Sequence, residues 1–382
     1  MPDAAMPATD LLGLTSAELA EWVTTLGEPK FRGAQLATWI FQALATTFDA
    51  MTNLPLRLRE QLAASATIAG PRLRHELIAR DGRTRKVLLE LADGKLIESV
   101  LMLYPASAEG RARASVCIST QAGCAFGCTF CATGQMGFER HLTAGEIVAQ
   151  VVYLARSLRA NPWIGPDGQA LEHITNVVLM GMGEPLHNYD NTLHAVRVLL
   201  DPHGLNLGAR HITLSTVGLV PGILRLADEG LQINLAISLH APNNAMRRAT
   251  MPVTRKYPLE EVLAACRTYA ARTNRQVTFE YVLLAGLNDG VAHAAELARL
   301  LAPLRQLAHV NLIPVNATAA DYRPPAGAVI RAFRDELTRG GVSNSVRAER
   351  GDDIAAACGQ LRTRAARRTT KEPDVTPSGS VR

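Results

Sequence analysis

Long apolar stretches are absent from the sequence, which contains no run of roughly 18 apolar residues of the kind that crosses a membrane. The opening residues, Met1 to Glu21, mix Asp, Thr and Glu with Leu and Ala, so they lack the basic and then apolar pattern of a secretory leader. Internal repeats are absent too. We therefore expect a cytoplasmic protein, in which clustered cysteines indicate metal or redox chemistry more often than disulfide bonds.

Lysine is scarce, with five residues among the 40 Lys and Arg side chains. The 40 bases exceed the 35 acids by five, and residues 362–382 hold six bases and two acids, which leaves +1 for the rest of the chain. Net charge therefore gives no evidence for a nucleic-acid partner. The 382 residues, 47% of them hydrophobic, suffice for roughly two to three average domains and exclude a collagen-like, coiled-coil or wholly disordered chain.

Helical patterns dominate residues 1–75, which we expect to form a small helical domain that assists RNA binding. Thr15 and Glu18 have the spacing of a capping box, and amphipathic patterns follow over residues 31–44 and 56–64. Two apolar runs joined by a turn at Asp93 and Gly94 then predict a β-hairpin, which we place in a linker over residues 76–110.

From residue 111 onward, short apolar runs alternate with helical patterns. Predicted strands span residues 115–119, 176–180, 211–216, 233–238, 278–283 and 310–314. Predicted helices between them span residues 144–158, 191–200, 221–229, 258–272 and 292–301. This alternation predicts an α/β fold, and six strands, fewer than the eight of a closed barrel, favour a partial (β/α)6 barrel over residues 111–361. Residues 362–382 are expected to be a disordered basic tail.

Three cysteines, Cys124, Cys128 and Cys131, form a C-x3-C-x2-C pattern directly after the first strand of this series. One loop that supplies three thiolates suits a metal centre, because only deprotonated sulfur is a ligand. Structural zinc usually takes four protein ligands in paired spacings, whereas a 4Fe–4S cluster held by three cysteines keeps one iron open for another ligand. A zinc site completed by His141 or a distant cysteine is the alternative.

The cysteine pattern resembles that of the radical S-adenosylmethionine (SAM) superfamily, in which SAM binds the open iron of a 4Fe–4S cluster and is cleaved to a 5′-deoxyadenosyl radical. Further segments match in order at the ends of predicted strands: Gly183 and Glu184 in a GMGEP loop, Ser215, and then Ser238, Leu239 and His240. The resemblance implies that these residues contact SAM, with Glu184 facing its ammonium group. Taken alone, His240 would be interpreted as a structural histidine.

A narrower resemblance covers residues 98–361. The matching strings are CISTQAGCAFGCTFCATG (117–134), TNVVLMGMGEPLHN (175–188), ITLSTVGLVP (212–221), AISLHAPN (236–243) and RGDDIAAACGQL (350–361). They resemble the bacterial adenine-C2 methyltransferases, which methylate an adenine in 23S rRNA and in some tRNAs. The resemblance implies two SAM per turnover, 23S rRNA and tRNA as substrates, and a reducing partner such as flavodoxin or ferredoxin.

The same resemblance implies roles for two more cysteines. Adenine C2 is an electron-poor carbon and not a nucleophile, so direct methyl transfer from SAM would fail and a radical route is needed. Cys358 matches the cysteine that carries the methyl group, and Cys117 matches the thiol that forms a transient disulfide with it. Without the triplet, both would be interpreted as buried structural cysteines, as Cys266 is here.

Glu98 matches a family carboxylate that accepts the C2 proton, and whether Glu98 or Cys117 takes this proton stays open at this point. The other interpretation of Glu98 is a solvent-facing glutamate on a hairpin. Asn316 matches a SAM-contacting asparagine, although the residues after it, 317–322, depart from the proline- and glycine-rich loop of the family. Several arginines are either RNA contacts or a solvated face: Arg72, Arg74, Arg80, Arg83 and Arg85.

Three other functions compete with a monomeric RNA adenine-C2 methyltransferase. An adenine-C8 methyltransferase relative shares both mechanistic cysteines. A zinc-stabilised RNA-binding protein explains the triplet but leaves the segments at residues 181–185 and 238–240 without a role. A radical SAM enzyme with an unrelated substrate has no need of Cys358.

Overall fold

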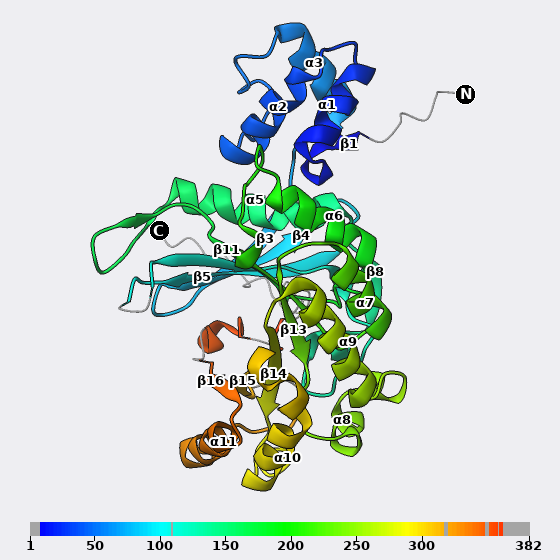
Figure 1. Ribbon diagram of the computed structural model, residues 1–382. Coiled ribbons are helices and arrows are strands. Elements are labelled where there is room, and N and C mark those ends of the chain that lie inside the picture. Colours follow the sequence, from blue (N-terminus) through cyan, green and yellow to red (C-terminus); the bar gives the residue numbers. More distant parts are fainter. Residues whose placement is uncertain (1–7, 108–109, 317–319, 348–350, 358, 362–382) are drawn as a thin grey trace, which may run out of the picture.

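The computed structural model describes residues 8–107, 110–316, 320–347, 351–357 and 359–361, which are built around one ten-stranded sheet (Figure 1). Neighbouring parallel strands make up most of it: β16 (Ser343–Val346), β15 (Ala308–Pro314), β14 (Val277–Leu283), β13 (Asn234–Ser238), β12 (Ile212–Thr216), β11 (Asn176–Leu179) and β6 (Arg113–Cys117). Antiparallel strands continue it: β5 (Leu96–Tyr104), β4 (Thr84–Glu90) and β3 (Arg72–Ile78). The α/β fold predicted from the sequence is confirmed.

Helices connect the parallel strands in the order expected of βα units. The longer ones are α5 (Ala144–Ala160), α6 (Tyr189–Leu200), α7 (Val220–Asp228), α9 (Leu259–Thr273), α10 (Val291–Leu301) and α11 (Gly327–Arg339). All six predicted strands and all five predicted helices of this region agree with the structure to within two residues at each end. Continuous apolar runs of buried strands and amphipathic helices carry the clearest sequence signals, so this agreement is expected.

Two strands of the sheet were not predicted. β16 has the polar sequence SNSV, and β3 is exposed along most of its length. Both are the edge strands of the sheet, where side chains meet solvent and the apolar signal is weak. The helical region predicted over residues 1–75 also extends too far, because α3 (Leu56–Ser65) is its last helix and β3 begins at Arg72.

The N-terminal helices lie against α5 and α6 at the top of Figure 1; they are α1 (Ser16–Thr25), α2 (Phe31–Ala37), a π-helical turn (Thr38–Gln42) and α3. The predicted capping box is confirmed, because Glu18 N donates to Thr15 Oγ1 over 3.3 Å and Thr15 N donates to Glu18 Oε2 over 2.8 Å. Gly13, just before α1, and Gly145 of α5 let these two segments approach closely, since a Cβ on Gly13 would lie 2.9 Å from the Gly145 nitrogen.

The helix α5 covers one face of the sheet, so the candidate site residues on β5 and β6 are expected on the opposite face. The buried Gln150 of α5 accepts a hydrogen bond from Ser99 Oγ over 2.7 Å and from Ser119 N over 2.8 Å. Ser99 follows Glu98 on β5, so the side chain of Glu98 points to the other face. In the described ranges, no helix has the length and apolarity needed to cross a membrane.

Candidate active site

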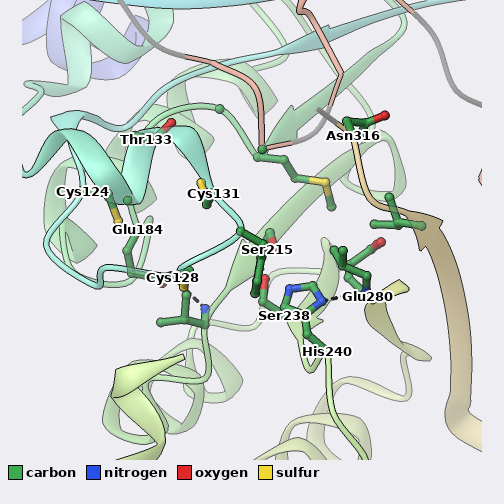
Figure 2. A pocket seen from close by; sticks show the side chains of 18 of the residues that line it. Cys124, Cys128, Cys131, Thr133, Glu184, Ser215, Ser238, His240, Glu280 and Asn316 are labelled. Atoms are coloured by element: carbon green, nitrogen blue, oxygen red, sulfur yellow. Dashed lines mark hydrogen bonds between the residues drawn. The ribbon is translucent and has the colours of Figure 1, made fainter. Parts of the chain in front are cut away.

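The carboxyl ends of the parallel strands surround one cavity, as Figure 2 shows. Nine of the residues predicted to bind a cluster or SAM line it: Cys124, Cys128, Cys131, Gly183, Glu184, Ser215, Ser238, His240 and Asn316. Ligand sites of α/β proteins lie at this edge of the sheet, because the loops after successive parallel strands meet there. The cavity is therefore the candidate active site.

The cysteine triplet lies on the loop between β7 (Gln121–Gly123) and the short helix α4 (Ala132–Met136). Burial raises the pKa of the Cys124 thiol to about 12, and the charges of Glu184 and Cys131 act in the same direction. Burial and the two neighbouring thiols also raise the pKa of Cys128 well above its ordinary value. The three sulfur atoms therefore influence one another, and a bound cationic group would favour their deprotonated forms.

The donor set fits a 4Fe–4S cluster, because three thiols from one loop border a single cavity. Each thiolate of such a cluster binds a different iron, so its ligands stand farther apart than those of a single ion. Among the residues that the structure describes, no three His, Cys, Asp or Glu side chains form a group that could hold one metal ion. His141, considered above for zinc, lies on β8 (Phe138–His141) and contacts Gln121 Nε2 through Nδ1 at 3.0 Å, and it is not among the cavity-lining residues.

The GMGEP loop after β11 is held close to β7, the short strand that precedes the cysteines. Gly183 has a φ of +101°, and a Cβ there would lie 2.5 Å from Gln121 Cβ, so only glycine fits without strain. Glu184 is buried; its carboxylate accepts hydrogen bonds from Leu186 N over 3.0 Å and from Val217 N over 2.8 Å. Burial raises the pKa of Glu184 to about 7 despite these bonds. Its carboxylate thus ties the loops after β11 and β12 together at the cavity wall.

The SLH segment after β13 divides into cavity-lining and supporting residues. Ser238 and His240 line the cavity, whereas Leu239 is fully buried and donates its N–H to Glu280 O over 3.0 Å. His240 Nδ1 accepts a hydrogen bond from Val282 N over 3.0 Å, and burial lowers the pKa of His240 to about 3. The imidazole is therefore neutral and carries its proton on Nε2. Leu239 is not among the residues that line the cavity, so its predicted contact with SAM stays a prediction.

Charged residues in and around the cavity were missed by sequence reasoning, among them Arg247, Glu280 and the cavity-lining Arg347. Arg247 is fully buried on α8 (Asn244–Thr250) and donates hydrogen bonds to Val217 O, Ser238 O and Leu239 O over 2.6, 3.0 and 3.1 Å. Glu280 on β14 lines the cavity, and burial raises its pKa. A carboxylate inside the apolar strand VTFEYVL was a usable signal for Glu280, but the segment NNAMRRAT gives none for Arg247.

Glu98 and Cys117 lie on the same face of the sheet but are not among the residues that line the cavity. Cys117 on β6 is paired with Val100 on β5, and Glu98 is two residues from Val100, so the two side chains point to one side. Glu98 is buried, with its Oε1 3.2 Å from Lys86 Nζ, and this corrects the interpretation of a solvent-facing glutamate. Burial raises the pKa of Glu98 to about 7, although the Lys86 charge opposes the rise.

Cys358 lies outside the described residues, as do residues 317–319 and the basic tail 362–382. The residues on either side of position 358 are described. Ala357 N donates to Gln360 Oε1 over 3.0 Å, and Gly359 O accepts from Ala132 N over 2.7 Å. Gly359 also lines the cavity. The chain after position 358 is thus held against the start of α4, directly after the cysteine triplet.

Comparison with known proteins assigns the chain to a family. Residues 9–68 match the ribosomal RNA large subunit methyltransferase N-terminal domain, and residues 167–298 match the radical SAM superfamily. The probable dual-specificity RNA methyltransferase RlmN of Symbiobacterium thermophilum is 50% identical over 360 residues, 94% of this chain and 92% of that protein. The protein of the same name from Moorella thermoacetica is 48% identical, over 92% and 97% of the two chains. The chain belongs to the RlmN family of radical SAM RNA methyltransferases.

A solved structure agrees with this assignment. A radical SAM methyltransferase from Sphaerobacter thermophilus superposes with a TM-score of 0.85 at 49% identity, and the match covers 93% of this chain and 99% of that one. Family membership confirms the predicted RNA methyltransferase activity, and the superfamily implies a 4Fe–4S cluster and SAM as cofactors. Family membership favours the RNA adenine-C2 methyltransferase hypothesis over the three alternatives: the C8-methylating relative, the zinc-stabilised RNA-binding protein and a radical SAM enzyme with an unrelated substrate.

Proposed function

We propose that this enzyme methylates C2 of a specific adenine in 23S rRNA and in a subset of tRNAs, in the cytoplasm and as a monomer. Two SAM are used per turnover, one to methylate Cys358 and one to start the radical reaction. The observation that carries this proposal is the position of the C-terminal segment. Gly359 lines the same cavity as the cysteine triplet, and its carbonyl accepts a hydrogen bond from Ala132 N at the start of α4, directly after the triplet. Gly359, the described residue next to position 358, thus borders the site where SAM is expected.

Cys124, Cys128 and Cys131 are proposed to hold a 4Fe–4S cluster with one iron left open for SAM. Such a cluster, reduced by a flavodoxin- or ferredoxin-type protein, would supply the electron that cleaves SAM to a 5′-deoxyadenosyl radical. The chain's own residues bind and orient SAM: Gly183, Glu184, Ser215, Ser238, Leu239, His240 and Asn316. Glu184 is suited to the ammonium group because its carboxylate borders the cavity, and Gly183 lets the backbone approach closely.

The sheet face beside the cavity is proposed to carry the remaining steps. Cys358 takes a methyl group from SAM and carries the carbon to adenine C2. Glu98 accepts the C2 proton; its raised pKa of about 7 makes it a stronger base than an ordinary glutamate. Cys117 closes a disulfide with Cys358 when the carbon leaves that sulfur, and this disulfide must then be reduced. The target adenine has to leave its base stack to reach these groups.

RNA contacts are proposed for the far end of the β3–β4 hairpin. Arg74 and Arg85 are already paired with hairpin glutamates, with Arg74 Nε 2.9 Å from Glu90 Oε2 and Arg85 Nε 3.4 Å from Glu76 Oε1. Arg72 on β3 is also within 3.9 Å of Glu90 Oε2. Arg80 belongs to the turn that joins the two strands and is the better candidate, with Arg83 beside it. Phosphate contacts of this kind weaken as salt rises. The basic tail would add to the same effect.

The test of the proposed function is nucleoside analysis of the product. Protein with a reconstituted cluster is incubated with SAM, a reductant and either a 23S rRNA fragment or tRNA, and the RNA is digested and compared with 2-methyladenosine and 8-methyladenosine standards. We expect 2-methyladenosine from wild type and from Cys266→Ala, and none from Cys358→Ala or Cys117→Ala. Formation of 8-methyladenosine, or of neither product by protein that cleaves SAM, would contradict the proposal.

A further inference from the structure

A buried lysine next to the proposed proton acceptor has no role in the steps given above. Lys86 is one of the five lysines of the chain, and its exposure is 8%. Lysine is rarely buried to this degree unless it is paired, because removing the ammonium group from water is costly. The contacts of this ammonium group therefore indicate what it is kept for.

The ammonium group of Lys86 bonds two parts of the chain that are far apart in sequence. Nζ lies 3.2 Å from Glu98 Oε1 and donates a hydrogen bond to Ala355 O over 3.0 Å. Glu98 belongs to β5 of the sheet, and Ala355 lies three residues before Cys358. One charged group thus bridges the proposed base and the segment that carries the proposed methyl carrier.

The C-terminal segment, residues 351–361, is anchored at both of its ends by other contacts. Near its start, Asp353 Oδ2 accepts a hydrogen bond from Arg80 N over 2.9 Å. At its end, Leu361 O accepts from Thr133 Oγ1 over 2.7 Å. Lys86 contacts the segment between these two anchors, at Ala355.

Strand register places Lys86 on the reactive face. Lys86 pairs with Val100, and Val100 pairs with Cys117, so the three form one row across β4, β5 and β6. Residues directly opposite in a ladder share a face, and Glu98 shares it because it is two residues from Val100. Lys86 therefore stands on the side of the sheet that presents the proposed base and the resolving thiol.

We propose that Lys86 is a positioning residue whose ammonium group binds the Glu98 carboxylate and the Ala355 carbonyl together, and so sets the distance between the proton acceptor and the segment that carries Cys358. The proposal rests on the proposed function, because it takes its meaning from the roles of Glu98 and Cys358. It assigns Lys86 no contact with the RNA or with SAM. Its effects should appear in the ionisation of Glu98 and in the order of residues 351–361.

The charge of Lys86 gives the sign of the first effect. The positive charge opposes the rise of the Glu98 pKa, so its removal raises that pKa further above 7. The deprotonated carboxylate is the acceptor, so the acidic limb of the rate profile moves to higher pH. By register, the other titratable or charged groups on this face are Arg72 and His75 on β3, Glu90 on β4, Tyr104 on β5, and Arg113 and Cys117 on β6, and Asp353 lies on the C-terminal segment. None of these groups changes in a Lys86 variant.

The first experiment measures 2-methyladenosine formation against pH for wild type, Lys86→Met and Lys86→Arg. Lys95→Met is the matched control, since Lys95 belongs to the same hairpin but is exposed and pairs with Glu139 at 2.6 Å. We expect the acidic limb of Lys86→Met to move up by about one to three pH units, the typical effect of one opposite charge at this distance. Lys86→Arg, which keeps the charge, should restore most of the wild-type position, and Lys95→Met should not move it.

The second experiment needs no catalysis and follows hydrogen exchange of the peptide spanning residues 351–361 in protein without RNA. Faster exchange in Lys86→Met than in Lys95→Met and wild type supports the bridge to Ala355, and Lys86→Gln, which also removes the charge, takes its place if the methionine variant does not fold. If Lys86→Met has the same acidic limb in its pH–rate profile and the same hydrogen exchange as wild type, the proposed role of Lys86 is overturned while the proposed function stands. The proposed function itself fails if wild type makes no 2-methyladenosine, and the exchange result remains interpretable in that case.

Discussion

Replacing the buried Arg247 should lower the folding stability by an amount that follows from the number of its hydrogen bonds. It donates four hydrogen bonds: to Leu239 O, Val217 O, Ser238 O and Thr254 Oγ1. Burial lowers its pKa to about 10, so it is still charged at neutral pH. Methionine in its place fills part of the volume but leaves three buried carbonyl oxygens without that donor. Each such loss costs about 1 kcal/mol at the low end of the usual range, so Arg247→Met should cost roughly 3 kcal/mol.

The neighbouring residue supplies the control for this prediction. Arg248 is exposed on the same short helix, so Arg248→Met should change stability by less than about 0.5 kcal/mol. Urea unfolding followed by circular dichroism compares the two variants with wild type. Because Arg247 holds carbonyls after β12 and β13, SAM binding measured by calorimetry should weaken in parallel. A loss below about 1 kcal/mol with unchanged SAM affinity would refute the idea that Arg247 organises the cavity wall.

Three further predictions address individual residues. Gly183→Ala forces a Cβ against Gln121 at a φ of +101°, which should add about 1–3 kcal/mol of strain to the folded protein. The melting temperature and the SAM affinity measured by calorimetry should both fall, and unchanged values would contradict the backbone argument. Cys128→Ser should abolish bound iron and sulfide in reconstituted protein, whereas Cys266→Ser should retain both. The pKa of Glu98 is about 7 in the folded protein and has its ordinary value of about 4.5 in the unfolded chain, so the contribution of Glu98 to stability falls as pH rises through this window. Glu98→Gln should remove that share of the difference between the melting temperatures at pH 5 and pH 8, and an unchanged difference would count against a buried carboxylate.

The sheet could be predicted from the sequence where strands are buried and not where they are exposed. β14 and β15 carry apolar runs because helices cover them, so their bounds were clear. β16 is polar and gains its strand conformation by pairing with β15, a long-range contact that local sequence does not encode. β3 likewise depends on the ladder with β4.

The candidate site could likewise be predicted only in part. The cysteine spacing and the strand-end positions of Gly183 and Ser238 were visible in the sequence, and these residues line one cavity. Lys86 and Arg247 could not be recognised, because their roles depend on partners brought near by folding. The carbonyl that Lys86 binds belongs to Ala355, 269 positions away, and no spacing rule connects the two.

The most direct test of the account is the mass of the peptide that contains Cys358, from protein produced with iron and exposed to SAM. The account predicts a gain of one CH2 at Cys358, which is absent in Cys358→Ala and retained in Cys266→Ala. Such a gain would identify Cys358 as the methyl carrier. An unmodified Cys358 in protein that holds iron and cleaves SAM would contradict the central claim.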